Sequence, residues 1–263
     1  RASFSLEDKG ISATILALII DASLRSPAII RRVSLEHEVG DFVTILRSLG
    51  AGIYRKGRTI KISRLCLHAH GPLSITIPSD LITAGTAMVS GALLAEPRHL
   101  LMAGPDWRAR WLASLGQHCG INAYVDHGGA MHVESKSAKR GFQLRTGFPP
   151  HLPADLQPIF TILALSGNRT SSIEDRVHSD RFDHVAPLVA MGARITRVRR
   201  RLAIHPSQLQ GSVTVDKLGI REAAAMRLAQ VVHGVDLGSS DLDAMWRGYE
   251  RDTALTQLCF GRK

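Results

Sequence analysis

The sequence predicts an α/β protein made of repeats of helix, strand, helix, strand and strand, with helices packed inward and sheets outward. Three observations lead to this class: glycine turns recur along the chain, apolar helical segments precede them, and short strand patterns follow them. The turn glycines are Gly50, Gly116, Gly192 and Gly261, at spacings of 66, 76 and 69 residues. Glycine suits the end of a helix because a residue without Cβ adopts the left-handed conformation at little cost.

The first helix of each repeat is recognised by apolar residues at helical spacing, such as Ile15, Leu18 and Ile19. The expected first helices are Ile11–Leu24, Ser79–Ala95, Ala154–Ser166 and Gly219–His233. The strands expected after them are Ala28–Val33, His99–Ala103, Arg169–Ile173 and Val235–Leu237. The first helices are rich in Ala, Ile and Leu, which is explained if they pack against one another with the sheets outside.

Strand pairs follow the second helix of the first two repeats. We expect Ile53–Arg55 to be followed by Thr59–Ile62, and Ala123–Val125 by Met131–Glu134. The sequence Asp126-His127-Gly128-Gly129 between the latter two strands is typical of a hairpin turn. A strand pair therefore closes each of these repeats.

The repeats divide into two predicted domains. One repeat falls in residues 1–66 and three fall in residues 67–263, with Leu65–Gly71 as the candidate linker. Because a repeat gains its core from its neighbours, the single repeat is not expected to bury both faces of its helices. The fourth repeat has no closing strand pair, so we expect both ends of the fold to be incomplete.

Composition favours a folded cytoplasmic protein. Of the 263 residues, 44% are hydrophobic and 21% are charged, which is ordinary for a globular domain. No apolar run reaches the roughly 18 residues of a membrane helix, and the N-terminal sequence has no signal-peptide pattern. Cys66, Cys119 and Cys259 are odd in number and lack metal-like spacing, which favours reduced, buried thiols. We expect no metal, no cofactor and no membrane partner.

The net charge of +10 raises the question of a polyanionic partner. The run Arg194-Ile195-Thr196-Arg197-Val198-Arg199 alternates apolar and polar residues, as a half-buried strand with a solvated basic face does. Aromatic residues make up only 5% of the chain and do not interleave with this run. A stacking platform for nucleic acid is therefore not expected, and we interpret these arginines as surface residues.

Asp155 lies where an extended segment turns into a helix. Pro149, Pro150 and Pro153 force an extended backbone, and the helical pattern begins at Ala154. Backbone N–H groups in a first helical turn have no partner within the helix, and the helix dipole favours negative charge there. Asp155 is therefore either a stabilising N-terminal residue or an acid–base group directed at a ligand.

Four stretches of the chain are specific enough to indicate a family. They are Glu36–Asp41, Pro78–Thr86, Pro153–Gln157 with Arg181–Val185, and Arg247–Glu250. In order and spacing the chain resembles the enolpyruvyl transferases, most closely the branch that acts on UDP-N-acetylglucosamine in peptidoglycan synthesis. The similarity covers nearly the whole chain but only about the last two-thirds of a family member.

The resemblance implies an inside-out α/β barrel fold of two domains with three repeats each, and an active site in the cleft between them. Residues 1–66 would then be the remnant of the first domain. The family's catalytic lysine and the mobile loop with its reactive cysteine belong to the N-terminal third, which has no counterpart here. The implied partners are phosphoenolpyruvate, a nucleotide sugar or related hydroxyl acceptor, and a second chain that completes the fold.

The resemblance also implies roles for three charged residues. Asp155 would contact the sugar hydroxyl as the acid–base group, and Arg247 would bind the carboxylate of phosphoenolpyruvate, which suits a planar bidentate donor. Arg221 would be a second family arginine near the start of the last long helix. Arg247 is expected to begin a helix, where the dipole disfavours a cation, so an anionic partner is favoured.

Six further substrate-binding residues follow from the same resemblance: Lys9, Ser12, Glu36, Glu38, Phe182 and Val185. Lys9 and Ser12 would hold the uridine diphosphate portion, and Phe182 and Val185 would line the nucleotide-sugar site. Other interpretations stay open. The two glutamates are also typical of residues leading into a helix, and Phe182 is equally typical of a core residue.

The expected function is therefore transfer of the enolpyruvyl group from phosphoenolpyruvate to a hydroxyl of a nucleotide sugar such as UDP-N-acetylglucosamine. Without the lysine and the loop, we expect this chain alone to be incomplete or inactive as an enzyme. The alternative is a non-catalytic binding or assembly module that keeps the fold.

Overall fold

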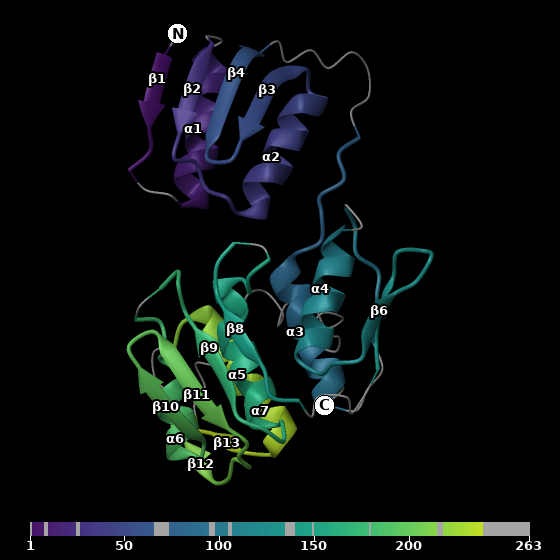
Figure 1. The fold of residues 1–263 in the computed structure, drawn as a ribbon, viewed down its shortest axis with the longest axis vertical. Coiled ribbons are helices and arrows are strands. Elements are labelled where there is room, and N and C mark those ends of the chain that lie inside the picture. Colours follow the sequence, from purple (N-terminus) through teal and green to yellow (C-terminus); the bar gives the residue numbers. More distant parts are fainter. Residues whose placement is uncertain are drawn as a thin grey trace. The chain divides into compact units, whose positions relative to one another are not determined.

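The computed structural model describes residues 2–7, 10–24, 27–65, 74–94, 98–104, 107–134, 140–148, 150–178, 180–214 and 218–238. The chain forms two compact units, Arg1–Ile77 and Pro78–Lys263, each with its own hydrophobic core (Figure 1). The predicted boundary between residues 66 and 67 falls outside the described residues and stays a prediction.

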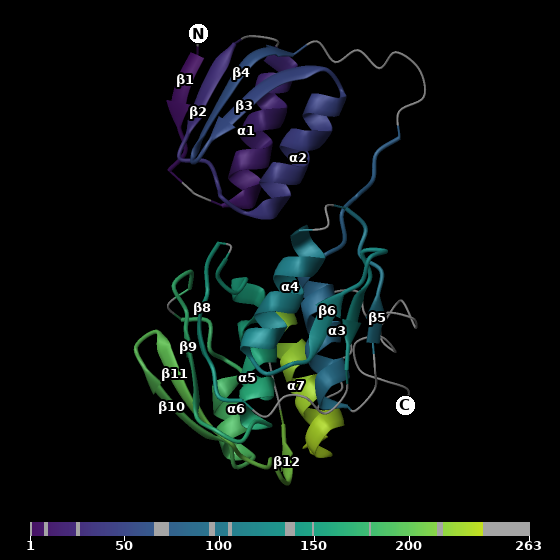
Figure 2. The same cartoon turned by 45° about the vertical axis from the view of Figure 1, so that its right-hand side comes forward.

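The N-terminal unit is a four-stranded sheet with two helices on one face (Figure 2). Its elements are β1 (Ala2–Ser5), α1 (Ile11–Leu24), β2 (Ala28–Arg31), α2 (His37–Ser48), β3 (Ala51–Lys56) and β4 (Thr59–Leu65). The strand order is β1-β2-β4-β3, with β1 parallel to β2 and the other pairs antiparallel. Leu16, Ile19 and Ile20 of α1 are exposed, as expected for a repeat without neighbours on that side.

The C-terminal unit holds three sheets and five α-helices among the described residues. Its elements are α3 (Leu81–Leu93), β5 (Arg98–Leu100), α4 (Trp107–His118), β6 (Ala123–Val125), β7 (Met131–Val133), β8 (Gln143–Arg145), the 3₁₀ turn η1 (Ala154–Leu156), α5 (Gln157–Leu165), β9 (Ser171–Glu174), α6 (Val185–Ala190), β10 (Arg194–Val198), β11 (Arg201–His205), β12 (Ser212–Val213), α7 (Ile220–His233) and β13 (Asp236–Leu237). The sheets have the orders β5-β7-β6, β10-β11-β9-β8 and β12-β13.

Helix α5 lies at the centre of the C-terminal unit. All of its residues are buried, and it contacts both α3 and α7 (Figure 2). The strands lie around these helices, so the fold is a mixed α/β fold with apolar helices in its core. The sheets formed by the described residues are open, and the inside-out barrel stays a proposal. No helix in the described ranges is long and apolar enough to cross a membrane.

The predicted first helices are all present, with small shifts at their ends. The helix expected from Ser79 starts at Leu81, because the Asp80 side chain accepts a hydrogen bond from the Ile82 N–H at 2.8 Å and caps the helix. The helix expected from Ala154 starts as a 3₁₀ turn and becomes α-helical at Gln157. One helix therefore starts later than its apolar spacing predicts, because a side-chain cap sets its start.

The prediction that Gly116 ends a helix is wrong. Gly116 lies inside α4, where a Cβ would come within 2.8 Å of the Met88 Sδ, so it serves close packing against α3. The left-handed residue after α4 is Gly120, with φ at 87°. The predicted turns at Gly50 and Gly192 are confirmed by φ values of 92° and 97°.

A second close approach fixes η1 on the core. A Cβ on Gly85 of α3 would lie 2.6 Å from Cδ1 of Leu156, which is fully buried. Real side chains do not approach so closely, so the absence of a side chain at residue 85 lets η1 pack on α3. This contact holds the turn that carries Asp155.

Gly85→Ala is expected to lower the free energy of unfolding by about 1–3 kcal/mol, because the added methyl group overpacks the contact with Leu156. Urea unfolding followed by circular dichroism measures the change. Gly40→Ala in α2 is the matched control, since its Cβ would meet Arg55 Nη1 at an ordinary 3.7 Å. The control should stabilise by about 0.5–1 kcal/mol. Unchanged stability of Gly85→Ala would contradict the packing argument.

Candidate functional site

The candidate site forms where η1 and the start of α7 meet. Asp155 is the middle residue of η1 and Arg221 is the second residue of α7. Arg221 Nη1 donates a hydrogen bond to Asp155 Oδ1 at 3.3 Å, across 66 residues of sequence. The structure therefore brings two of the predicted site residues into contact.

Arg221 has a second carboxylate partner. Its Nε donates to Oε1 of Glu222 at 2.8 Å, and the side chain of Glu222 is only 4% exposed. The Arg221 side chain is itself 10% exposed, whereas that of Asp155 is 32% exposed. A buried guanidinium needs such partners, because removing a charge from water is costly unless it is paired and hydrogen-bonded.

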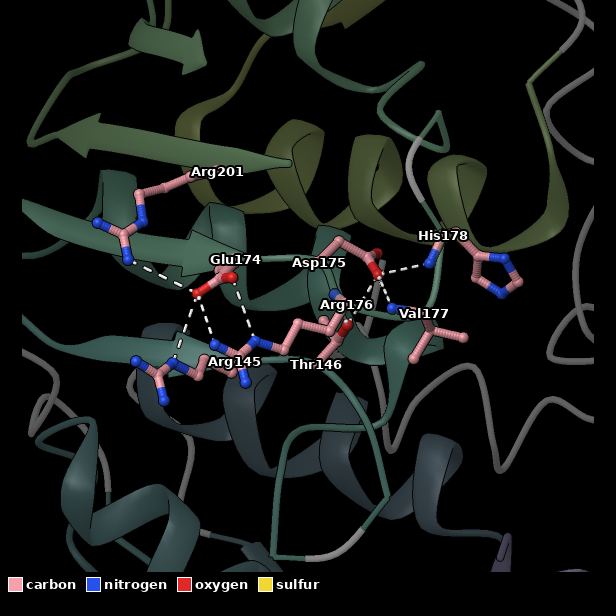
Figure 3. A network of polar contacts seen from close by, with 8 residues as sticks. All are labelled: Arg145, Thr146, Glu174, Asp175, Arg176, Val177, His178 and Arg201. Carbon is pink, nitrogen blue, oxygen red and sulfur yellow. Dashed lines mark hydrogen bonds and ion pairs between the residues drawn. The ribbon is translucent and has the colours of Figure 1, made fainter. Parts of the chain in front are cut away.

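A turn after β9 brings His178 toward this pair. Asp175 is fully buried, and its Oδ1 accepts hydrogen bonds from Thr146 Oγ1 at 2.7 Å, Val177 N–H at 2.9 Å and His178 N–H at 2.8 Å. Figure 3 shows these three donors converging on the carboxylate. The turn is thus fixed by one side chain rather than by strand pairing.

The charges of the site act on His178. Burial is the main cause that lowers the pKa of His178, and the charges of Arg181 and Arg221 lower it further. The carboxylates of Asp175 and Asp155 oppose this shift. His178 therefore lies within the electrostatic range of the Asp155–Arg221 pair and favours its neutral form near pH 7.

Buried polar side chains lie close to the site, on the side of α5. His184 is fully buried, and its Nε2 lies 3.4 Å from Thr161 Oγ1 and 3.5 Å from Gln157 Nε2. Burial, with the charge of Arg221 second, lowers the pKa of His184 to about 3. His184 is therefore a neutral hydrogen-bonding group near neutral pH, and it adds no positive charge beside Arg221.

Phe182 is both a core residue and part of a groove wall. Only 3% of the residue is exposed, and the Arg197 guanidinium carbon lies 4.2 Å from the centre of its ring. The groove has a volume of about 1150 Å³ and is lined by residues of the segment before α6, of α6, of β10 and at the end of β12, including Phe182, Asp183, Val185, Val189, Arg197 and Thr214. Both interpretations of Phe182 are therefore compatible with its position.

Five further predicted residues fall in the N-terminal unit or outside the described residues. Ser12 is exposed in the first turn of α1, Glu36 precedes α2 with its N–H donating to Ser34 Oγ at 3.2 Å, and Glu38 is exposed in the first turn of α2. All three belong to the N-terminal unit. Lys9 and Arg247 lie outside the described residues.

A separate cluster of charges lies on the β8–β9–β11 sheet. Glu174 pairs with Arg176 Nε at 3.1 Å, Arg145 Nε at 3.4 Å and Arg201 Nη2 at 3.6 Å (Figure 3). Hydrogen bonding from Arg176 is the main cause that lowers the pKa of Glu174. The arginine side chains are about half exposed, so water screens these pairs and they contribute little stability.

Sequence reasoning missed several residues near the site. Gln157 and His184 stand within the quoted motifs, but their types alone indicate no role. Glu222 follows Arg221 directly and occupies a first helical turn, where an acidic residue is ordinary. Nothing in sequence spacing indicates the positions of Asp175 and His178, because side-chain hydrogen bonds of Asp175 fix the turn that carries them.

The described residues hold no group of three His, Cys, Asp or Glu side chains arranged to bind a metal ion. The carboxylates of the candidate site instead bind a guanidinium. An arginine between acidic side chains, one of which is partly exposed, suits proton transfer and anion binding.

Comparison with known proteins defines the class. The family model described as EPSP synthase (3-phosphoshikimate 1-carboxyvinyltransferase) matches residues 2–252. The chain therefore belongs to this family of enolpyruvyl transferases, which confirms the resemblance seen in its motifs.

Relatives in this family carry more specific names. The chain is 30% identical over 262 residues to UDP-N-acetylglucosamine 1-carboxyvinyltransferase 2 of Shouchella clausii, covering 98% of this chain and 60% of that protein. It is 28% identical to the protein of that name from Listeria monocytogenes, covering 95% of this chain and 58% of the relative. The chain thus spans about 60% of the length of the relatives it matches.

Solved structures show the same fold. The enolpyruvyl transferase NikO from Streptomyces tendae superposes with a TM-score of 0.76 at 21% identity, covering 98% of this chain and 63% of that one. EPSP synthase from Acinetobacter baumannii gives a TM-score of 0.68 at 15% identity, covering 97% and 61%. At these identities the likeness concerns the fold alone.

His184 is expected to make the protein sensitive to acid. Its folded pKa of about 3 lies below the ordinary 6.5, so the unfolded chain binds this proton first as the pH falls. The neutral imidazole makes its full contribution to the free energy of unfolding above about pH 6.5. As the pH falls below that value, the contribution decreases by at most about 1.4 kcal/mol per pH unit. Between about pH 6.5 and 4.5, wild type should lose about 2 kcal/mol more than His184→Gln.

Urea unfolding across this pH range measures the free energy of unfolding of each protein. The slopes of this free energy against pH are compared, so a loss of stability in the variant that does not depend on pH has no effect on the result. His151→Gln, at an exposed position near η1, is the control and should follow wild type. Equal slopes for wild type and His184→Gln would contradict the burial of a neutral imidazole.

Proposed function

We propose that the C-terminal unit carries one part of a site for enolpyruvyl transfer from phosphoenolpyruvate to a hydroxyl group. In this proposal Asp155 is the acid–base group, and Arg221 binds an anionic group of phosphoenolpyruvate. The observation that carries it is the 3.3 Å contact between these two side chains, which stand 66 positions apart in the sequence.

The reaction explains why these residue types are needed. The acceptor oxygen bonds to C2 of phosphoenolpyruvate and loses its proton, while C3 gains one; phosphate then leaves as C3 loses a proton. A carboxylate near the hydroxyl serves as base, and cations stabilise the carboxylate and phosphate charges. The partly exposed Asp155 and the guanidinium of Arg221 supply one group of each kind.

The proposed acceptor is a nucleotide sugar of the UDP-N-acetylglucosamine type, in cytoplasmic peptidoglycan precursor synthesis. The names of the relatives from Shouchella clausii and Listeria monocytogenes support this substrate. The groove beside Phe182 and Val185 is a candidate for part of the ligand. Roles for Lys9, Ser12 and Arg247, and for the glutamates 36 and 38, belong to the same proposal, as do the inside-out barrel and a second chain that completes the site.

Arg221→Gln is expected to weaken phosphoenolpyruvate binding at least tenfold, about 1.4 kcal/mol, because a neutral amide replaces the cation that faces the ligand. Isothermal titration calorimetry of the full chain measures it. Arg201→Gln, at an exposed arginine of the same unit that pairs with Glu174, is the control and should bind as wild type does. Equal affinity of Arg221→Gln and wild type would contradict the role of Arg221.

Asp155→Asn separates binding from chemistry. The variant should bind phosphoenolpyruvate within about threefold of wild type, since the amide still accepts from Arg221. With UDP-N-acetylglucosamine and the second chain that completes the site, wild type should release phosphate and the variant should release none. A folded wild-type chain that binds neither phosphoenolpyruvate nor UDP-N-acetylglucosamine would contradict the proposal and favour a non-catalytic module.

A further inference from the structure

The two carboxylates that bind Arg221 differ in their surroundings. Glu222 is almost completely buried and accepts from Nε at 2.8 Å, whereas Asp155 is about one-third exposed and accepts from Nη1 at 3.3 Å. The shorter and more buried contact is the harder one to exchange for water. Glu222 is thus the fixed partner of the guanidinium, and Asp155 is the exchangeable one.

A glycine makes room for the Glu222 carboxylate. Gly219 is the N-cap of α7, and a Cβ at this position would lie 2.4 Å from Glu222 Oε2. Its backbone angles, φ −70° and ψ 163°, are ones that any residue adopts. Glycine at residue 219 therefore provides space rather than a special conformation, and a side chain there would have to displace the carboxylate.

The start of a helix is a poor place for a buried cation. The dipole of α7 favours Glu222 and disfavours Arg221 at this end. Without Glu222, the guanidinium would depend on Asp155 for charge balance. If Asp155 also takes up and releases a proton, Arg221 would lose its partner at each protonation, and a buried unpaired charge costs several kcal/mol.

We propose that Glu222 is a positioning residue of this site: it anchors Arg221 through Nε, so that Asp155 can exchange its proton while the guanidinium stays in place. Its catalytic meaning rests on the function proposed above for Asp155 and Arg221. The anchoring itself involves no ligand and can be measured on the free protein.

The direct test is the exchange rate of the Arg221 Nε–H with solvent, measured by ¹H–¹⁵N nuclear magnetic resonance on the full chain. Glu222→Ala should speed exchange at least tenfold, because the acceptor is lost. Glu222→Gln should stay within about threefold of wild type, because its amide oxygen still accepts. Asp155→Asn should also leave the Nε–H protected, since that residue contacts the other end of the guanidinium.

Gly219→Ala provides an independent variant that alters no charge. Its methyl group should displace the Glu222 carboxylate and speed exchange as Glu222→Ala does, with no further effect when the two changes are combined. Gly238→Ala is the matched control, because its Cβ would meet Thr214 Oγ1 at an ordinary 3.5 Å. Glu174→Gln controls for loss of an acidic residue that pairs with other arginines.

Unchanged exchange in both Glu222→Ala and Gly219→Ala, or strictly additive effects of the two, would overturn the proposal. If Glu222→Ala does not fold, Gly219→Ala carries the test. Phosphoenolpyruvate titration on the same samples separates the two claims: anchoring predicts at least tenfold weaker binding in Glu222→Ala and rescue in Glu222→Gln. If the Arg221 Nε–H of wild type is protected but wild type binds no phosphoenolpyruvate, the proposed function is refuted and the anchoring of Arg221 stands.

Discussion

The candidate site depends on one buried guanidinium. Arg221 lies in the first turn of α7 with its charge largely removed from water, and the carboxylates of Asp155 and Glu222 balance it. Neutral His184 adds no charge beside it. Because a buried cation without partners is so unfavourable, the three side chains act as one electrostatic group, and η1 and α7 are joined through it.

The fold holds this group by close packing rather than by loops. Helix α5 is buried along its whole length between neighbours that include α3 and α7, and η1 directly precedes it. Gly85 lets Leu156 approach α3, and Gly219 leaves space for Glu222. Each glycine makes room for a side chain that belongs to the site or is next to it in the sequence. Core packing therefore determines where the site residues lie.

Sequence reasoning found the mixed α/β fold because its helices and turns depend on local periodicity. Apolar spacing located the four long helices, and the glycines at 50 and 192 marked two true turns. The prediction for Gly116 failed because glycine in a helical pattern occurs both at helix ends and at close contacts between helices. Only the position of Met88 in the structure distinguishes the two cases. With Gly120 in its place, the first three turns are spaced by 70 and 72 residues, which is more regular than predicted.

The site was predicted in part. Asp155 and Arg221 stood in motifs that resemble a family, and the structure brings them together. Glu222, Asp175 and His178 were not found, because their positions follow from side-chain hydrogen bonds that no single sequence reveals. Lys9 and Arg247 lie outside the described residues and stay predictions.

A double-mutant cycle on Asp155→Ala and Arg221→Ala, read as the free energy of unfolding without any ligand, tests the contact between η1 and α7 most directly. Given the partial exposure of Asp155, we expect the two side chains to be coupled by about 1 kcal/mol. Effects that add to within about 0.3 kcal/mol would show that the two side chains do not interact, and the site assembled around Arg221 would be contradicted.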